Sequence, residues 1–347
     1  MSLEGLGLAG LLAAVLVLPF SVRHVEEELE AFLLVMGALA VTISGQWSGA
    51  LLHSALMEPL PLSLAVLGAG ALFLSGRSGL RSWIRGRWQG WGPGASSVAL
   101  VAGLGLLSCV LTGLVAALML AEALDALRLP RRAEVRLAVL ACFAIGLGSA
   151  LTPLGGPLAA IAVGRLRGEP YHADAFFLLR LLGPWVLGLT ALLAVFALRW
   201  GWGVQAGEAH RAHVEPHAWG ALGLRGLRAY GFVLGLVLLG QGFQPLAERW
   251  LPALPGWALF WANSSSALLD NATLVAAELG PRVPPDRLRW LLLGLLLSGG
   301  MLIPGNIPNI LCAAQRRIRP KEWARVGVPL GLALMVLVHL VLWAWGR

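Results

Sequence analysis

The sequence predicts an all-α polytopic membrane protein built from inverted repeats, each with a re-entrant hairpin and a discontinuous transmembrane helix. Of its 347 residues, 58% are hydrophobic and 13% are charged, whereas soluble globular proteins carry about 25% charged residues. Apolar runs of roughly 17–25 residues, the length that crosses a bilayer, recur along the chain. Proline and glycine interrupt two apolar runs at corresponding positions, and this pattern predicts the repeats.

Eight apolar segments are predicted to be membrane spans. The first resembles a signal peptide in length, but Glu4 rather than a basic residue precedes its apolar run and no A-x-A cleavage site is evident. We therefore interpret it as the first transmembrane helix. The predicted spans are 5–20, 31–45, 59–75, 137–163, 176–198, 229–245, 288–314 and 327–346.

Segment 253–278 is predicted to enter and leave the membrane on the same side. Two legs of about ten residues flank the polar turn "NSSS" at 263–266. Ten helical residues extend about 15 Å, which is half of the hydrocarbon core. A turn at that depth is tolerated only where protein or a wet cavity surrounds it.

Segment 97–125 is compatible with a single tilted helix or with a second re-entrant hairpin. The flanking loops 76–91 and 126–136 each contain four arginines. Cytoplasmic loops are enriched in Lys and Arg, so both loops are predicted to lie inside, which favours the hairpin. The remaining topology then places both termini outside and makes the second hairpin enter from the outer face.

A short motif occurs twice and predicts the break in each discontinuous helix. Residues 148–157 read "GSALTPLGGP" and residues 299–308 read "GGMLIPGNIP". The chain is accordingly divided into N-terminal scaffold helices (1–75), a first repeat (76–198) and a second repeat (199–347). The positions that match at one offset are Gly148/Gly299, Leu151/Leu302, Pro153/Pro304, Pro157/Pro308 and Arg165/Arg316.

Proline and glycine explain how a membrane span is split into two half-helices. Proline removes a backbone donor and clashes with the preceding turn, and glycine lets the backbone unwind. Kinks of this kind can serve packing alone, but paired breaks in two repeats are typical of a transporter binding site. The predicted break residues are Pro153, Pro157, Pro304, Gly305 and Pro308.

Asp270 is the principal candidate for ion binding because it lies inside the second hairpin. An acidic residue at membrane depth costs roughly 2.5–3.5 kcal/mol on insertion scales and is normally functional. One such carboxylate can exchange a proton for a metal ion. The alternative is a structural Asp that is hydrogen-bonded to neighbouring serines. In the first hairpin the acidic residues Glu122 and Asp125 lie only near its end, where they are expected at the membrane interface, as is Glu278 near the end of the second hairpin. One acidic site is therefore expected.

Amide and hydroxyl oxygens near Asp270 suit a hard monovalent cation. Sodium is expected at Asp270, Asn263 and Asn306, and no resident cofactor is expected. The other candidates in the second half are Ser264, Ser265, Ser266, Asn271, Thr273 and Asn309. Those in the first half are Ser108, Thr112, Ser149, Thr152, Gly155 and Gly156.

Other functional classes receive less support. The net charge of +8 comes largely from arginines in short loops between apolar runs, where they set topology, so a nucleic-acid partner is not expected. The sequence has no His-rich metal motif, no G-x-S-x-G motif and no sizeable soluble segment. An enzyme is therefore not expected, and a membrane scaffold remains a minor alternative.

The motifs "SSALLDNATLVAAE" and "SGGMLIPGNIPNI" resemble those of the ion transporter superfamily, which includes NhaD-type sodium/proton antiporters, arsenite permeases and dicarboxylate carriers. The closest resemblance is to its family of predicted cation transporters, in which "MEPLPLSLAVL" (57–67) also has a counterpart. The resemblance covers roughly 40–345. It implies an elevator-like transporter, often a homodimer, in which Asp270 and Asn271 match the Asp-Asn pair of NhaD-type proteins. The chain departs from them in its shorter length and in lacking an acid in the interior of the first hairpin, away from its end.

The expected function is secondary active transport in the inner membrane, most simply exchange of sodium or lithium for protons. The partners would be the lipid bilayer, a small inorganic ion and a second copy of the chain. The alternative is a sodium-coupled carrier of a dicarboxylate or oxyanion, with the anion at half-helix N-termini.

Overall fold

The computed structural model describes residues 3–345 apart from 23, 26–27, 75–77, 128, 202–218, 251–253, 269–270 and 281–282. Throughout this part of the chain the regular structure is helical and no strand occurs. The predicted all-α class is therefore confirmed. Each predicted membrane span coincides with a helix, or with a pair of short helices where a break was predicted.

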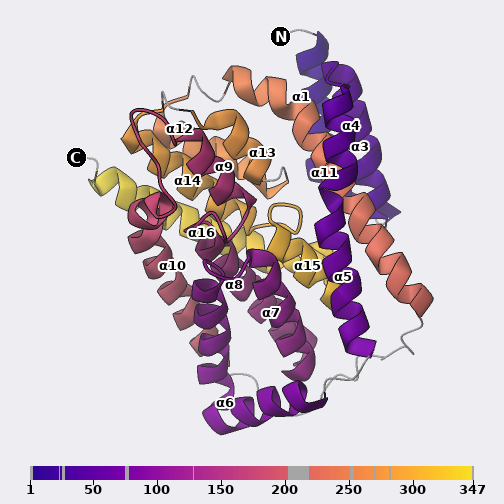
Figure 1. Ribbon diagram of the computed structural model, residues 1–347, viewed down its shortest axis with the longest axis vertical. Coiled ribbons are helices and arrows are strands. Elements are labelled where there is room, and N and C mark those ends of the chain that lie inside the picture. Colours follow the sequence, from indigo (N-terminus) through magenta and orange to yellow (C-terminus); the bar gives the residue numbers. More distant parts are fainter. Residues whose placement is uncertain are drawn as a thin grey trace.

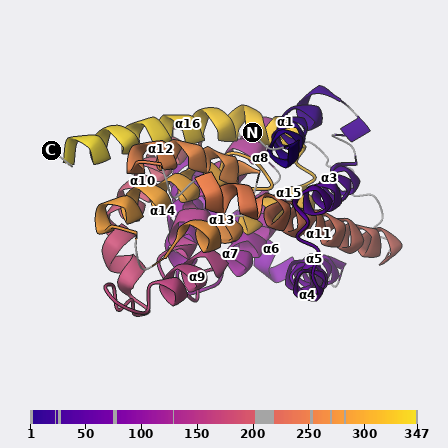
Figure 2. The same ribbon diagram turned by 90° about the horizontal axis from the view of Figure 1, so that it is seen from above.

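One group of helices stands at one side of the molecule in both ribbon views (Figures 1 and 2). Its long members α3 and α11 pack along each other, and α5 lies against α11. Thus α11, which belongs to the second half of the sequence, joins the N-terminal helices. The group consists of α1 (Leu3–Ser21), α3 (Leu29–Ser44), α4 (Gly49–Met57), α5 (Pro59–Leu74) and α11 (Trp219–Trp250).

Small residues bring α3 and α11 into backbone contact. A Cβ atom added to Gly37 of α3 would lie 2.7 Å from the carbonyl oxygen of Gly235 and 2.8 Å from Cβ of Leu238. Small residues at helix crossings are typical of membrane proteins, in which association depends on close packing rather than on a hydrophobic driving force.

The second group of helices contains both hairpins and both broken spans. Its first half comprises α6 (Ser78–Leu107), α7 (Gly113–Leu127), α8 (Arg131–Ser149), α9 (Pro157–Arg165) and α10 (Phe177–Gly201). Its second half comprises α12 (Gly256–Ala262), the 3₁₀ helix η2 (Asn263–Ala267), α13 (Asn271–Glu278), α14 (Pro285–Gly299), α15 (Ile307–Arg316) and α16 (Pro320–Trp345).

In the first segment that was predicted as a hairpin, two helical legs are joined by a turn, and in the second, residues 269–270 before α13 lie outside the described residues. Gly92, with φ of 78°, and Pro93 kink α6, so that the leg 93–107 turns at 108–112 into α7. In the second unit α12 leads through η2 toward α13. The α6–α7 unit lies in the lower part of Figure 1 and the α12–α13 region in the upper part, so the two approach the middle from opposite ends.

The two predicted breaks are present. The helix α8 ends at Ser149 and α9 begins at Pro157, while α14 ends at Gly299 and α15 begins at Ile307. In both cases proline occupies one of the first two positions of the second half-helix, where its missing N–H costs nothing. The matched motifs thus predict real interruptions of the helices.

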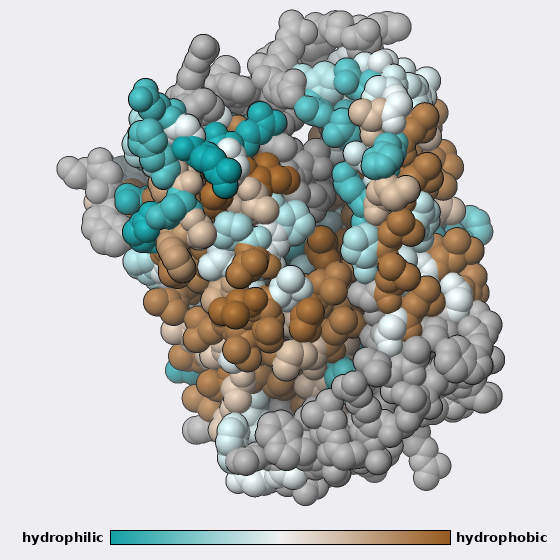
Figure 3. Space-filling model, viewed as in Figure 1, coloured by the Kyte–Doolittle hydropathy of each residue, from teal (hydrophilic) through white to brown (hydrophobic). Residues whose placement is uncertain are grey.

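Four helical segments in the described part of the chain are long and apolar enough to cross a membrane: Gly90–Leu107, Phe177–Arg199, Gly226–Leu246 and Pro320–Ala344. Large apolar side chains such as Val110, Leu187 and Val195 are exposed on the surface. Figure 3 shows apolar residues gathered across the middle of one face, with hydrophilic residues above them. These features indicate a membrane protein.

Replacing Gly37 by Ala is expected to destabilise the fold by about 1–3 kcal/mol, because the new methyl group would meet the backbone of α11. Thermal unfolding in detergent would measure the change. The matched control is Gly10→Ala in α1, where a Cβ meets nothing within 4 Å, so stability should be unchanged or slightly higher. Equal unfolding midpoints for both variants would contradict the close packing of α3 on α11.

Candidate functional site

A small cavity lies where the two broken helices meet. Its volume is about 30 Å³, enough for a dehydrated ion or one or two waters, since a buried water needs roughly 10–15 Å³. Its first-half lining is Gly146, Ser149, Ala150, Gly156, Pro157 and Leu158, and its second-half lining is Asn271, Leu296, Asn306 and Ile307. Each half therefore contributes its break to a single site.

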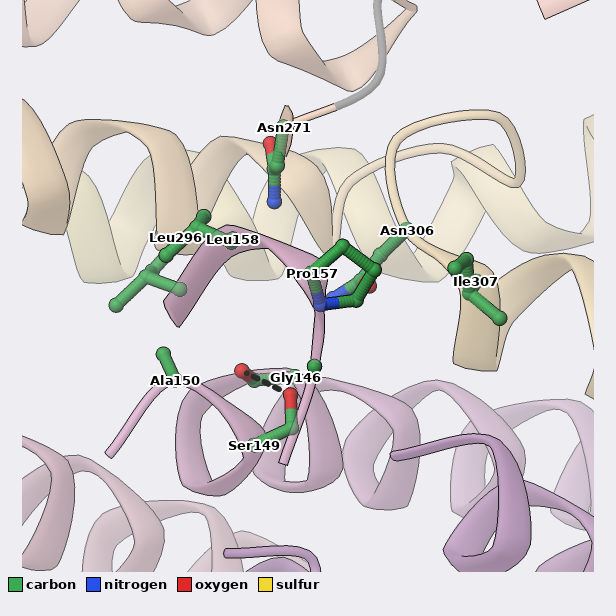
Figure 4. Close-up of a pocket in the computed structure, with 10 residues that line it drawn as sticks. Gly146, Ser149, Ala150, Pro157, Leu158, Asn271, Leu296, Asn306 and Ile307 are labelled. Carbon is green, nitrogen blue, oxygen red and sulfur yellow. Dashed lines mark hydrogen bonds between the residues drawn. The ribbon is translucent and has the colours of Figure 1, made fainter. Parts of the chain in front are cut away.

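Polar side chains face this cavity from three elements (Figure 4). Asn271 begins α13 and points toward the break of the first half, and Asn306 immediately precedes α15. The amide nitrogen of Asn306 lies 2.5 Å from the place that a Cβ of Gly146 would occupy. Only glycine at 146 leaves room for Asn306, so this contact joins the second break to α8.

The two breaks close in the same way. A Cβ on Gly155 would lie 2.2 Å from the carbonyl oxygen of Ser149, and one on Gly305 would lie 2.6 Å from that of Gly299. Gly305 follows Gly155 by 150 residues, and Gly299 follows Ser149 by the same number, whereas the matched sequence motifs, such as Gly148 and Gly299, are 151 residues apart. The lack of a side chain at these two positions lets each loop fold back onto the end of its own helix.

Corresponding serines attach each hairpin turn to its broken helix. Ser108 Oγ contacts the carbonyl oxygen of Ile145 at 3.0 Å, and Ser266 Oγ contacts that of Leu295 at 3.2 Å. Each of these carbonyl groups lies four residues before the helix end. Each hydroxyl has one proton and a nearer polar neighbour, Gly105 O at 2.7 Å for Ser108 and Ser298 Oγ at 2.6 Å for Ser266. The same contact, rather than one fixed hydrogen bond, thus occurs in both halves, between elements in corresponding sequence order.

A buried hydroxyl cluster adds to this contact in the second half. Ser298 Oγ lies 2.6 Å from each of three oxygens: the carbonyl of Asn263, the carbonyl of Gly294 and the hydroxyl of Ser266. Because a hydroxyl has one proton, Ser298 donates to one carbonyl at a time and can accept from Ser266. The cluster fixes η2 against α14.

The unwound carbonyl groups of the second break are satisfied by an asparagine. Asn309 Nδ2 donates to the carbonyl oxygens of Gly299 at 2.8 Å and of Leu302 at 2.9 Å. In the first break, partners come from the hairpin turn instead. The Gly113 N–H donates to the Gly155 carbonyl at 2.7 Å, and Thr152 Oγ1 donates to the Cys109 carbonyl. The first half therefore closes its break without an asparagine.

The remaining predicted ligands are dispersed. Asp270 lies outside the described residues, and the side chain of Thr273 is not described either. Ser264 is exposed and Ser265 half-buried. Thr112 is exposed, and its hydroxyl accepts from the N–H of Val115 at the start of α7.

Unpaired acceptor oxygens are the chemical feature that distinguishes the second half. Within the described residues, the Oδ1 atoms of Asn263, Asn271 and Asn309 and Oε1 of Glu278 are buried and have no hydrogen-bond donor. Glu278, which was expected at the membrane interface, is buried within the protein, with 8% of its surface exposed. Buried acceptors without donors are costly and suit a cation or an ordered water.

An ionic cluster at the far ends of the broken helices was not predicted. Arg131 at the start of α8 makes paired contacts to Glu322 of α16 at 2.9 and 2.7 Å, and these hydrogen bonds raise the pKa of its guanidinium. Arg316 at the end of α15 binds Glu134 at 2.5 Å and Asp125 at 2.8 Å. The cluster holds the two halves together at one end, and the only sequence signal was the matched pair Arg165/Arg316.

The fold and the site define a helical membrane protein in which two interrupted helices and Asn271 of α13 line a small cavity. The chain belongs to the family described as "Protein of unknown function (DUF1646)", whose model matches residues 6–345. It matches none of the curated proteins with which it was compared.

Replacing Asn309 by Ala should destabilise the protein by about 2–6 kcal/mol, because two buried carbonyl groups lose their donor at roughly 1–3 kcal/mol each. Thermal unfolding and limited proteolysis of the 299–308 segment would detect the change. Ser264→Ala, at an exposed site in the neighbouring hairpin, should leave both unaltered. A fully stable Asn309→Ala protein would contradict the role assigned to this amide.

Proposed function

We propose that this protein is a secondary active transporter that exchanges sodium or lithium for protons across the inner membrane. The observation that carries the proposal is a small cavity that both helix breaks and Asn271 line. The Asn271 amide nitrogen faces this cavity in Figure 4, and its buried Oδ1 has no hydrogen-bond donor. A half-turn of the amide about χ2 would present that oxygen to a hard cation. Asp270 precedes Asn271 in the chain and would supply the carboxylate that binds the cation or the proton in turn.

Leg lengths support the re-entrant hairpins on which this proposal depends. The apolar segment Gly90–Leu107 contains the kink at Gly92, so its straight leg is 93–107. This leg and the 15-residue α7 each extend about 22 Å at 1.5 Å per residue, short of the ~30 Å of hydrocarbon. The legs α12 and α13 contain 7 and 8 residues. With the equivalent serine contacts of Ser108 and Ser266, these lengths favour two repeats of opposite orientation.

The ends of the half-helices give the cavity both electrostatic signs. The N-terminal residues of α9 and α15 line it, and so do the last residues of α8. Helix N-termini favour anionic groups, whereas helix C-termini favour cations. In the proposed mechanism, the N-termini stabilise the Asp270 carboxylate and the α8 carbonyl groups face the cation. The same N-termini favour one rival function, a sodium-coupled carrier of a dicarboxylate or oxyanion.

Alternating access would come from movement of one helix group against the other. The hairpins and broken helices form one group, and α1, α3, α4, α5 and α11 form the other. In the proposed scheme α1, α3, α4, α5 and α11 are the scaffold that pairs with a second copy of the chain, while the hairpins and broken helices carry the cavity across the membrane. Both termini would lie outside, and the chain would need no resident cofactor.

Asp270→Asn should abolish sodium-driven proton movement in vesicles, because an amide cannot exchange a proton for a cation. A pH-sensitive dye inside proteoliposomes would report the exchange. The matched control is Asp174→Asn, which removes an exposed loop carboxylate that pairs with Arg180 and should leave exchange unchanged. Wild-type exchange rates in the Asp270 variant would refute the assigned role.

Concentration jumps on a solid-supported membrane would separate the two transport functions. Under the proposed exchange, jumps of sodium or lithium alone evoke a transient current in the wild type, and jumps of dicarboxylate or oxyanion at constant sodium do not. Currents that require the anion would replace cation/proton exchange with the sodium-coupled carrier.

Cysteine labelling would test the orientation of the hairpins. In a variant without Cys109, Cys142 and Cys312, the exposed positions Gly90→Cys and Arg132→Cys flank the first hairpin, and Pro255→Cys and Asp286→Cys flank the second. A membrane-impermeant thiol reagent should label each flanking pair from a single side, with opposite sides for the two hairpins. Labelling of Gly90→Cys and Arg132→Cys from different sides would mean that the segment spans the membrane.

A further inference from the structure

Glu278 is a buried acidic residue that the proposed exchange site does not use. It ends α13 and is 8% exposed. Its Oε2 accepts a hydrogen bond of 2.9 Å from Asn263 Nδ2, and its Oε1 has no donor. Among the described residues it makes no ion pair. A buried carboxylate needs a compensating charge or several hydrogen bonds. The described residues supply one hydrogen bond, to Oε2, so Oε1 is open to a ligand among them.

Asn263 supplies a second oxygen with the same deficiency. It is fully buried at the start of η2. Its Nδ2 also contacts the carbonyl oxygen of Leu291 at 3.3 Å. A backbone carbonyl only accepts hydrogen bonds, so the NH₂ group must face Leu291 and Glu278. The Oδ1 of Asn263 is thereby left as a buried acceptor without a donor.

Glu278 and Asn263 lie apart from the cavity, but Glu278 belongs to α13, whose first residue, Asn271, lines it. Asn271 and Glu278 are separated by seven residues, about two helical turns, and therefore share one face of α13. Leu274 and Val275 on the same face are also buried. The Glu278 carboxylate thus lies about 10 Å along the helix from Asn271, and neither it nor Asn263 lines the cavity.

We propose that Glu278 and Asn263 form a second site for a dehydrated monovalent hard cation, sodium or lithium. Oε1 of Glu278 and Oδ1 of Asn263 are its side-chain ligands. The described residues contain no cluster of three His, Cys, Asp or Glu residues, and one carboxylate with one amide is too little charge for the carboxylate-rich sites that calcium prefers. The inference rests on the proposed function for the class of ion, and it places two cation sites on one hairpin.

Binding of radioactive sodium to the purified chain, measured by scintillation proximity, tests this site. Glu278→Gln preserves the shape of the side chain and an acceptor for Asn263, but removes the charge. It should bind one sodium ion fewer per chain than the wild type, as should Asp270→Asn, and the double variant should bind none. Asp174→Asn should match the wild type. An unchanged number of sodium ions in Glu278→Gln, or no sodium binding by the wild type, would overturn the inference.

A second variant covers the case in which Glu278→Gln does not give a monodisperse protein. Glu278→Asp keeps the negative charge but moves the carboxylate away from Asn263. The sodium affinity of one site should therefore fall by about tenfold or more. Unchanged sodium affinity at both sites would overturn the inference. The number of sodium ions bound is measured independently of the exchange assay. If Glu278→Gln binds one sodium ion fewer but the wild type moves no protons, only the proposed exchange is contradicted. If the wild type exchanges sodium for protons but Glu278→Gln binds as much sodium as the wild type, only the second site is contradicted.

Discussion

Unpaired backbone groups at the ends of α8 and α14 are the constraint on which the rest of the structure depends. In a membrane interior water cannot satisfy them, so the protein must supply each partner. In the second break Asn309 donates to the carbonyl groups of Gly299 and Leu302, and in the first the N–H of Gly113 donates to the Gly155 carbonyl. Ser108 and Ser266 contact a carbonyl one turn before the helix end, which already accepts an intrahelical hydrogen bond, and attach the hairpins there. This requirement explains why a hairpin accompanies each broken helix and why Gly155 and Gly305 lie against their own helix ends.

The two halves solve this problem with different residues, and the difference concentrates polar chemistry in one of them. The first break exchanges hydrogen bonds with the first hairpin, since Gly113 N–H donates to the Gly155 carbonyl and Thr152 of the break donates to the Cys109 carbonyl, whereas the second uses Asn309. The second half also holds the unpaired oxygens of Asn263, Asn271 and Glu278. The two halves thus combine similar backbone geometry with unequal side chains.

Much of the fold could be predicted from local sequence signals. The apolar runs predicted the helices, and the paired Pro-Gly motifs predicted the breaks, because both depend on backbone chemistry that a few residues determine. The pairing of α11 with α3 could not be predicted, since it depends on tertiary contact at Gly37. Burial of Glu278 was missed for the same reason. Its position near the end of a short leg indicated an interface, whereas the actual partner, Asn263, lies on the other leg of the same hairpin.

Proton movement driven by cation gradients in vesicles that contain only the purified wild-type chain would test the central claim most directly. The account predicts that an inward sodium or lithium gradient drives protons out, that potassium does so much less, and that the response needs no organic anion. Vesicles that acidify or alkalinise only when a dicarboxylate is present, or not at all with any cation, would contradict it.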